Sequence, residues 1–194
     1  MNKNINLIIG SGVLGAYLAL ELLKKKEKVI VTTRSIKKKL KNYHYLKIQE
    51  KVKFIKLDVN KKIKVKKIIN EYNPNKIFYF AGQSSLTKSL KDKKGTFISH
   101  FNGTKNFLDV MREENLKIKF FKANSGYIFS PKKGLIDINC KFSSNNNPYI
   151  KAQQKTFKLI KKYRKFGLKL FNLVFMQIES PLRPNDFFIK KVCL

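Results

Sequence analysis

The sequence predicts an α/β protein in which helices cover both faces of a mostly parallel sheet. Short apolar runs of strand length alternate with segments of helical apolar period along the whole chain. Continuously apolar strands are typical of a parallel sheet that is buried on both faces. The 194 residues, 43% of them hydrophobic, suffice for one domain with a sizeable core. The expected architecture is therefore a three-layer α/β/α sandwich of the Rossmann type, whose ligands bind at the carboxyl ends of the strands.

Six strands and four helices follow from this pattern. Strands are expected where apolar residues dominate, at Ile5–Ile9, Lys28–Thr32, Val52–Leu57, Lys76–Phe80, Ile118–Ala123 and Leu168–Phe175. Helices are expected between them, at Ala16–Lys25, Lys61–Glu71, Thr104–Glu114 and Tyr149–Lys165. Asn73-Pro74-Asn75 and Gly167 stand where two of these helices are expected to end.

The first strand passes directly into a glycine-rich turn and then into a helix. Gly10-x-Gly12-x-x-Gly15 has the order and spacing of a dinucleotide-binding turn. Gly10 would permit the tight turn, Gly12 would let a pyrophosphate approach the backbone, and Gly15 would let the helix pack closely on the strand. The N–H groups at the start of the helix would attract the phosphates. We therefore expect Gly10, Ser11, Gly12, Val13, Leu14 and Gly15 to bind a dinucleotide; the alternative is a turn that only joins strand to helix.

The end of the second strand bears on the choice of nicotinamide cofactor. An acidic residue there would hold the ribose 2′-hydroxyl of NAD, whereas an arginine can pair with the 2′-phosphate of NADP. Arg34 follows the strand and no carboxylate lies nearby. NADP is thus favoured over NAD, the alternative being that Arg34 is only a solvated surface residue.

The formal net charge of +31 would by itself suggest a polyanionic partner. Only four of the 43 basic residues are arginines, however, and arginine is the residue that usually reads phosphates and bases. The excess of Lys, Asn, Ile, Phe and Tyr fits a compositional drift toward residues with A/T-rich codons. We therefore expect no specific nucleic-acid partner.

The cysteines and histidines form no pattern of metal ligands. Cys140 and Cys193 are far apart, and His44 and His100 are isolated, so no metal site is expected. The sequence predicts a cytoplasmic protein without a membrane anchor, because its two cysteines form no disulfide framework, it shows no signal peptide, and no apolar run approaches 18 residues.

Several motifs resemble those of the GDP-mannose 4,6-dehydratases, a family within the extended short-chain dehydrogenases/reductases. Phe80-Ala81-Gly82-Gln83-Ser84 resembles the family's Leu-Ala-Ala-Gln-Ser segment, and Asn147-Pro148-Tyr149 resembles its Ser-Pro-Tyr. The end of the third strand, with Asp58 and Val59, resembles Gly-Asp-Leu, and the segment around Ser125 resembles the end of the family's fifth strand. The segment from Glu179 to Lys191 resembles Glu-Ser-Pro-x-Arg followed by Phe-x-x-x-Lys.

The resemblance implies a sugar-nucleotide dehydratase. The C4 hydroxyl of GDP-mannose would be oxidised by hydride transfer to NADP, water would leave across C5 and C6, and the hydride would return to C6. Tyr149 would be the catalytic base and Ser125 would hydrogen-bond the same oxygen. Gln177, Arg183 and Lys191 would bind the sugar nucleotide, and Asp58, Val59 and residues Phe80, Ala81, Gly82, Gln83 and Ser84 would bind the cofactor. A homo-oligomer is also implied.

Some positions depart from the family pattern. Gln153 stands four residues after Tyr149, where the family has a lysine that lowers the pKa of the tyrosine. Tyr127 stands where the family has the glutamate that removes the C5 proton, and His100 and Gly95 also differ. We expect 1–194 to be the NAD(P)-binding domain, with 177–194 starting the nucleotide-sugar part and the C-terminal substrate domain largely absent. The alternative is a dinucleotide-binding protein or partner subunit of the same descent that has lost turnover.

Overall fold

The computed structural model describes residues 4–36, 40–137, 139–185 and 187–193, the side chains of Phe188 and Lys191 excepted. Its six strands form one parallel sheet in the order β3-β2-β1-β4-β5-β6. The strands are β1 (Ile5–Ile9), β2 (Lys28–Thr33), β3 (Lys53–Lys56), β4 (Lys76–Tyr79), β5 (Lys119–Ser125) and β6 (Leu170–Phe175). The predicted Rossmann-type α/β fold is confirmed, with each predicted strand present and most ends shifted by one or two residues.

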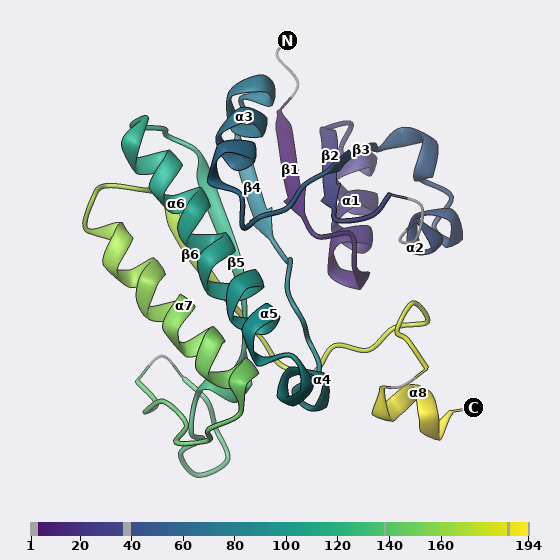
Figure 1. Ribbon diagram of the computed structural model, residues 1–194. Coiled ribbons are helices and arrows are strands. Elements are labelled where there is room, and N and C mark those ends of the chain that lie inside the picture. Colours follow the sequence, from purple (N-terminus) through teal and green to yellow (C-terminus); the bar gives the residue numbers. More distant parts are fainter. Residues whose placement is uncertain (1–3, 37–39, 138, 186, 194) are drawn as a thin grey trace.

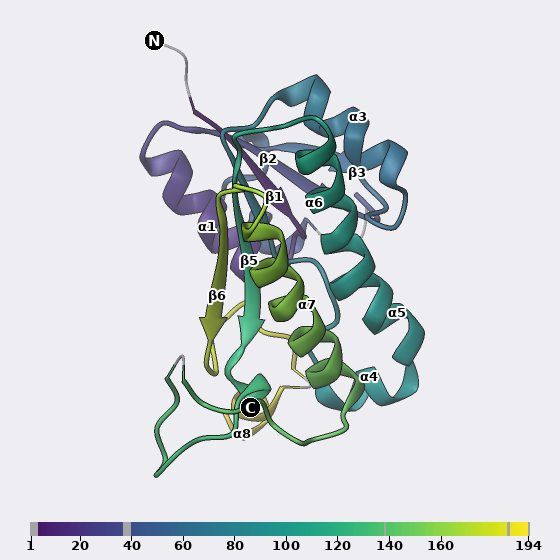
Figure 2. The same cartoon turned by 90° about the vertical axis from the view of Figure 1, so that its left-hand side faces the viewer.

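Helices lie on both faces of the sheet, as Figures 1 and 2 show. Helix α1 (Val13–Lys24) covers one face beside β1 and β2, and the short α2 (Lys41–Tyr45) packs against it. The other face carries α3 (Lys62–Tyr72), α6 (Gly103–Glu113) and α7 (Pro148–Arg164). The predicted three layers are therefore present.

The sheet separates two apolar clusters. On the side of α3, α6 and α7, Tyr79, Phe107 and Phe120 are fully buried. On the side of α1, Ile8 and Val31 pack against Ala16 and Ala19, and Leu182 joins them from the segment after β6. Because both faces of β1 are buried, its apolar residues are continuous, as expected of a central parallel strand.

Several short helical segments do not follow from the apolar pattern. They are α4 (Leu86–Lys91), α5 (Lys93–Phe97), a π-helical turn (Ile98–Asn102), α8 (Phe188–Val192) and two 3-10 turns (Gln49–Lys51 and Gly126–Ile128). Side chains cap the N-termini of α4 and α5: Ser85 Oγ accepts from the Lys88 N–H at 3.2 Å, and Asp92 Oδ1 accepts from the Gly95 N–H at 2.8 Å. Such caps stabilise a helix too short to show an apolar period. The predicted helix at Thr104 thus continues a helical run that starts at Lys93.

A row of aromatic rings crosses the face of the sheet that α1 leaves uncovered near β6. Phe121 of β5 stacks on Phe78 of β4 and on Phe171 of β6, with ring centroids 4.8 Å apart in both pairs. Phe171 is 40% exposed at the edge strand. Within the described ranges, no helix combines the length and the apolar character needed to cross a bilayer.

Candidate active site

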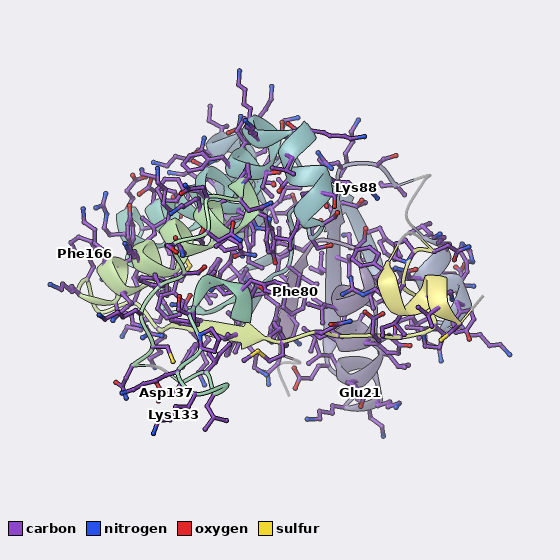
Figure 3. All side chains as sticks on the ribbon, turned by 90° about the horizontal axis from the view of Figure 1, so that it is seen from below. Glu21, Phe80, Lys88, Lys133, Asp137 and Phe166 are labelled. Atoms are coloured by element: carbon purple, nitrogen blue, oxygen red, sulfur yellow. The ribbon has the colours of Figure 1, made fainter. Side chains whose placement is uncertain are left out.

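A cavity of about 800 Å³ opens at the carboxyl edge of the sheet. It lies where the strand order reverses between β1 and β4, the position at which open α/β sheets bind ligands. Its walls come from residues 12–15, residues 80–88, the end of β5 with the start of α7, and the segment after β6. Figure 3 views the molecule from this side, with Phe80 near the middle and Glu21 and Lys133 at the margin.

The glycine turn has a geometry that only glycine permits at two positions. Gly10 has φ +108°, and a Cβ there would lie 2.9 Å from the backbone nitrogen of Ala81. A Cβ on Gly15 would overlap the carbonyl oxygen of Gly10, so the helix starts directly against the strand end. Gly12, in contrast, has no described atom within 4 Å of such a Cβ and faces open space. The roles predicted for these three glycines fit this geometry.

The start of α1 presents unsatisfied hydrogen-bonding groups beside that open space. Gly12 is the N-cap of α1, it offers no side chain, and the first turn holds no acidic residue. Ser11 is buried, and its Oγ has no hydrogen-bond partner among the described residues. An N-terminus of this kind attracts anions, because its first N–H groups are unpaired and the helix dipole is positive there.

The segment after β4 forms the floor of the cavity and is tied to His100. Gly82 has φ +138°, and a Cβ there would overlap the His100 ring. The carbonyl oxygen of Gln83 lies 2.8 Å from His100 Nε2, and Gln83 Oε1 accepts from the Ser85 N–H at 2.8 Å. The predicted residues Phe80, Ala81, Gly82, Gln83 and Ser84 all line the cavity.

His100 is a buried, neutral histidine in the wall of the cavity. Burial lowers its pKa to about 3, with a smaller contribution from the charge of Lys122. A carbonyl only accepts, so Nε2 carries the proton and Nδ1 is the unprotonated nitrogen. Nδ1 is buried and has no partner among the described residues. The ring lies edge to face with Tyr149, with centroids 5.4 Å apart.

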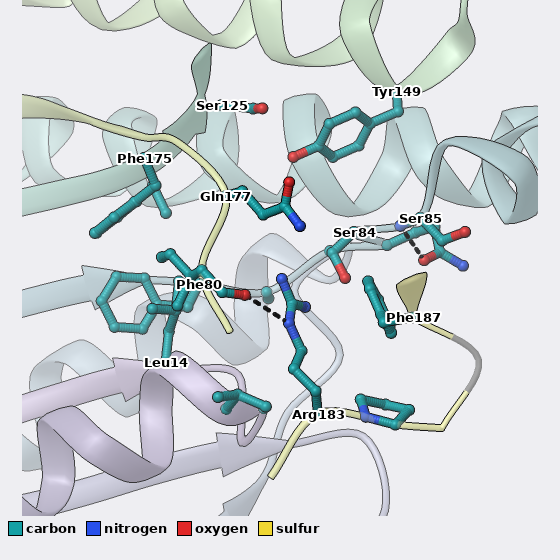
Figure 4. A pocket seen from close by; sticks show the side chains of 18 of the residues that line it. Leu14, Phe80, Ser84, Ser85, Ser125, Tyr149, Phe175, Gln177, Arg183 and Phe187 are labelled. Carbon is teal, nitrogen blue, oxygen red and sulfur yellow. Dashed lines mark hydrogen bonds between the residues drawn. The ribbon is translucent and has the colours of Figure 1, made fainter. Parts of the chain in front are cut away.

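Ser125 and Tyr149, the two predicted catalytic residues, line the same cavity. Ser125 ends β5, and its Oγ accepts from the Tyr127 N–H at 3.3 Å. Tyr149 is fixed at the start of α7, since Pro148 occupies the first turn and Asn147 Oδ1 accepts from the Tyr149 N–H at 2.9 Å. Figure 4 shows the Tyr149 hydroxyl directed into the pocket toward Gln177.

Lys122 is a lining residue that the sequence reasoning missed. Its side chain is 1% exposed, and its Nζ lies 3.5 Å from Gln153 Oε1 on α7 and donates to the Ala123 carbonyl. Burial lowers the pKa of its ammonium to about 7. The sequence held a signal, because Lys122 lies on the same face of the predicted strand as Phe120, and the structure buries that face. A lysine at an inward position of a central strand is uncommon.

The segment after β6 closes the cavity on its remaining side. The Arg183 guanidinium donates to the Ile178 carbonyl at 2.9 Å, lies 4.2 Å from the centroid of Phe187 and is 3.9 Å from Glu179. Gln177 and Arg183, both predicted to bind substrate, face the pocket in Figure 4. The side chain of Lys191, the third predicted substrate residue, lies outside the described residues.

Five predicted cofactor residues do not line this cavity: Gly10 and Ser11 of the glycine turn, and Arg34, Asp58 and Val59 at the carboxyl edge. Arg34 follows β2 and is exposed, and Asp58 follows β3 and accepts from the Asn60 N–H at 3.0 Å. Val59 is buried, and its carbonyl accepts from Asn106 at 2.9 Å. In the described part of the chain, no three His, Cys, Asp or Glu residues gather as metal ligands.

The fold and its sequence relatives define a member of the nucleotide-sugar epimerase and dehydratase class, within the extended short-chain dehydrogenases/reductases. The chain belongs to the GDP-mannose 4,6 dehydratase family, whose sequence profile matches residues 7–194.

Curated relatives are epimerases of the same class. CDP-paratose 2-epimerase of Salmonella typhi is 28% identical over 121 residues, which cover 62% of this chain and 36% of that protein. UDP-glucose 4-epimerase of Haemophilus influenzae is 21% identical over 179 residues, covering 91% of this chain and 53% of its own length. The chain thus spans about a third to a half of these relatives.

Solved structures agree on the fold. The dTDP-glucose 4,6-dehydratase DesIV of Streptomyces venezuelae, crystallised with NAD, superposes with a TM-score of 0.84 at 16% identity, over 96% of this chain and 60% of that one. UDP-glucuronic acid 4-epimerase of Bacillus cereus, in complex with UDP-glucuronic acid and NAD, gives 0.83 at 19% identity over the same shares.

Proposed function

We propose that the chain binds a nicotinamide dinucleotide, NADP in preference to NAD, and serves the 4,6-dehydration of a nucleotide sugar, GDP-mannose by family. One observation carries the proposal: a single cavity brings the glycine turn, Ser125 and Tyr149 together at the strand-order reversal. A dinucleotide bound there would have its phosphates at α1 and its reactive end near β5 and α7.

The residues present fit a dinucleotide. Gly12 leaves room at the uncapped start of α1, and the Oγ of the adjacent Ser11 is buried without a hydrogen-bond partner among the described residues. No acidic residue follows β2, and the exposed Arg34 can pair with a 2′-phosphate. These observations support both the cofactor class and the preference for NADP.

The chain's own residues can perform the proton transfers at the sugar C4 oxygen. Tyr149, whose hydroxyl is directed into the pocket, would take the hydroxyl proton, and Ser125 would hydrogen-bond the same oxygen. Gln177 and Arg183 would hold the sugar nucleotide on the side opposite α7. The dinucleotide, when bound, supplies a hydride acceptor and later a hydride donor.

A second candidate function is dinucleotide binding without turnover. Gln153 replaces the lysine of the family pattern, and Tyr127, in place of the glutamate, is 57% exposed and lines the cavity. These features favour a binding protein or a subunit of a larger assembly.

One experiment separates the two functions. The purified chain would be titrated with NADP by calorimetry and then incubated with NADP and GDP-mannose, with product followed by mass spectrometry. Formation of the 4-keto-6-deoxy sugar nucleotide, reduced about 10²- to 10⁴-fold in Tyr149→Phe, would support the dehydratase. NADP binding without product would favour the second function, and absence of NADP binding would refute both.

A further inference from the structure

Lys122 is a buried cation without an anionic partner. Among the described residues, Lys122 is the lysine that is buried. Its Nζ contacts the Ala123 carbonyl and the Gln153 carboxamide, and it lies 5.4 Å from the centroid of the Tyr79 ring. All three are neutral, and no described carboxylate forms an ion pair with it. Burying an ammonium is costly unless hydrogen bonds or an opposite charge replace its hydration.

The titratable groups around Lys122 do not supply that compensation. Tyr79 faces it from β4, and its pKa is raised by burial, so the phenol is neutral. His100 faces it from the π-helical turn and is neutral because its pKa is about 3. Tyr149 lies one turn before Gln153 on α7, and Glu179, elsewhere in the cavity wall, is engaged with Arg183.

The position of Lys122 points to a ligand as the missing partner. It lines the cavity from β5, two strands away from β1 in the sheet order, hence about 10 Å from the glycine turn. A phosphate held at α1 would therefore not reach it. The partner must be a polar group on the β5 side of the cavity, beside Ser125 and Tyr149.

Helix α7 has lysines close by in sequence, but they do not take this place. Lys155 is exposed, and its Nζ lies 5.1 Å from the centroid of Phe97. Position 153, which is buried and one turn from Tyr149, holds a glutamine whose Oε1 contacts Lys122 instead. The lysine at this point of the site is therefore supplied by β5 and not by α7.

We propose that Lys122 is the cationic ligand-binding residue of this cavity: its amine binds a hydroxyl oxygen of the dinucleotide on the β5 side and takes up a proton as the ligand binds. The assignment rests on the proposed dinucleotide function and names a residue for it that no family motif in the sequence pointed to. The depressed pKa of the free ammonium, about 7, is what makes the proton uptake measurable.

The test is calorimetric titration at pH 8 in buffers of different ionisation enthalpy, with NADP and ADP as probes. ADP reaches the glycine turn but not β5. The unmodified chain should take up a fraction of a proton per NADP, at most about 0.9, since an amine with a pKa near 7 is about nine-tenths neutral at pH 8. Lys122→Met should bind NADP at least 10-fold more weakly with no uptake, and should bind ADP as the unmodified chain does.

Two further variants control for structure. Lys155→Met removes an exposed lysine of α7 and should change neither affinity nor uptake. The exchange Lys122→Gln with Gln153→Lys returns a lysine to the same contact from the helix, and should recover NADP affinity to within about threefold of the unmodified chain.

The outcomes separate this proposal from the function on which it rests. If the unmodified chain binds NADP and Lys122→Met binds it equally well, only the assignment of Lys122 is overturned. Weaker binding by Lys122→Met with unchanged proton uptake, or equal weakening for ADP, also overturns it. Failure of the unmodified chain to bind NADP or NAD overturns both.

Discussion

Replacing Lys122 by methionine should stabilise the folded chain near neutral pH. Methionine has a similar length and needs no compensation for charge, whereas the ammonium is buried among neutral partners. The gain should depend on pH, because the penalty exists only while the lysine of the unfolded chain is charged.

The sign and size follow from the pKa of Lys122. Burial lowers it from 10.5 in the unfolded chain to about 7 in the folded one. Between these values the unfolded chain holds more protons, so the free energy of unfolding of the unmodified protein rises with pH. Each pH unit is worth about 1.4 kcal/mol, so the full interval corresponds to about 5 kcal/mol and the range from pH 7 to 9.5 to about 3 kcal/mol. Below pH 7 this contribution is constant.

Urea unfolding of both proteins at pH 6, 7, 8 and 9.5 measures the effect. The methionine variant also loses the donors to Ala123 and Gln153, about 1–2 kcal/mol that is independent of pH. Its stability relative to the unmodified chain should therefore fall by about 3 kcal/mol between pH 7 and 9.5. Titrating groups that do not interact with Lys122 cancel in this difference, and His100, which does, is neutral in both proteins between pH 7 and 9.5. A difference that stays constant over the range would refute the reasoning, because it would mean that Lys122 does not lose its proton there.

Three other outcomes are expected. Gly12→Val should abolish NADP binding with little change in the free energy of unfolding, because the site of its Cβ is open; Gly10→Ala, in which φ +108° and a 2.9 Å contact oppose the new Cβ, should instead lose about 1–3 kcal/mol in urea unfolding. Equal stability of the two variants would contradict these roles. Arg34→Ala should weaken NADP binding by about 1.5–3 kcal/mol and leave NAD binding nearly unchanged in calorimetry, while equal losses would remove Arg34 from the site. Gln153→Lys alone, with Lys122 retained, should weaken folding, since two ammonium groups would then meet in a buried site; unchanged urea unfolding would speak against that contact.

The features that the sequence predicted well are those encoded locally. The strand, the glycine turn and the first helix are contiguous, so their order and spacing define them before any packing is known. Ser125 and Tyr149 were placed by resemblance to short motifs, and the structure brings both into one cavity with the glycine turn. The start of the first helix was predicted less accurately, because α1 begins at Val13, directly after its N-cap Gly12, and not at Ala16.

The residues missed are those that depend on long-range packing. Lys122 reaches Gln153 across 31 residues, and His100 reaches the Gln83 carbonyl across 17. In the sequence, His100 is an isolated histidine and Lys122 is one lysine among many. They come to line the cavity only through strand pairing and the packing of α7 on the sheet. Their burial, and with it the pKa of each, is therefore a property of the fold.

The close backbone contacts around Gly10 have a thermodynamic consequence for any ligand of the cavity. The start of α1 lies directly under the Gly10 carbonyl, and Gly10 lies against the backbone of Ala81. Two walls of the site are thus held against each other by main chain, which leaves them little conformational freedom to lose on association. Binding at this end of the cavity should therefore cost little conformational entropy. The association rate should be set by the encounter of the ligand with a preorganised surface and not by the folding of a loop around the ligand.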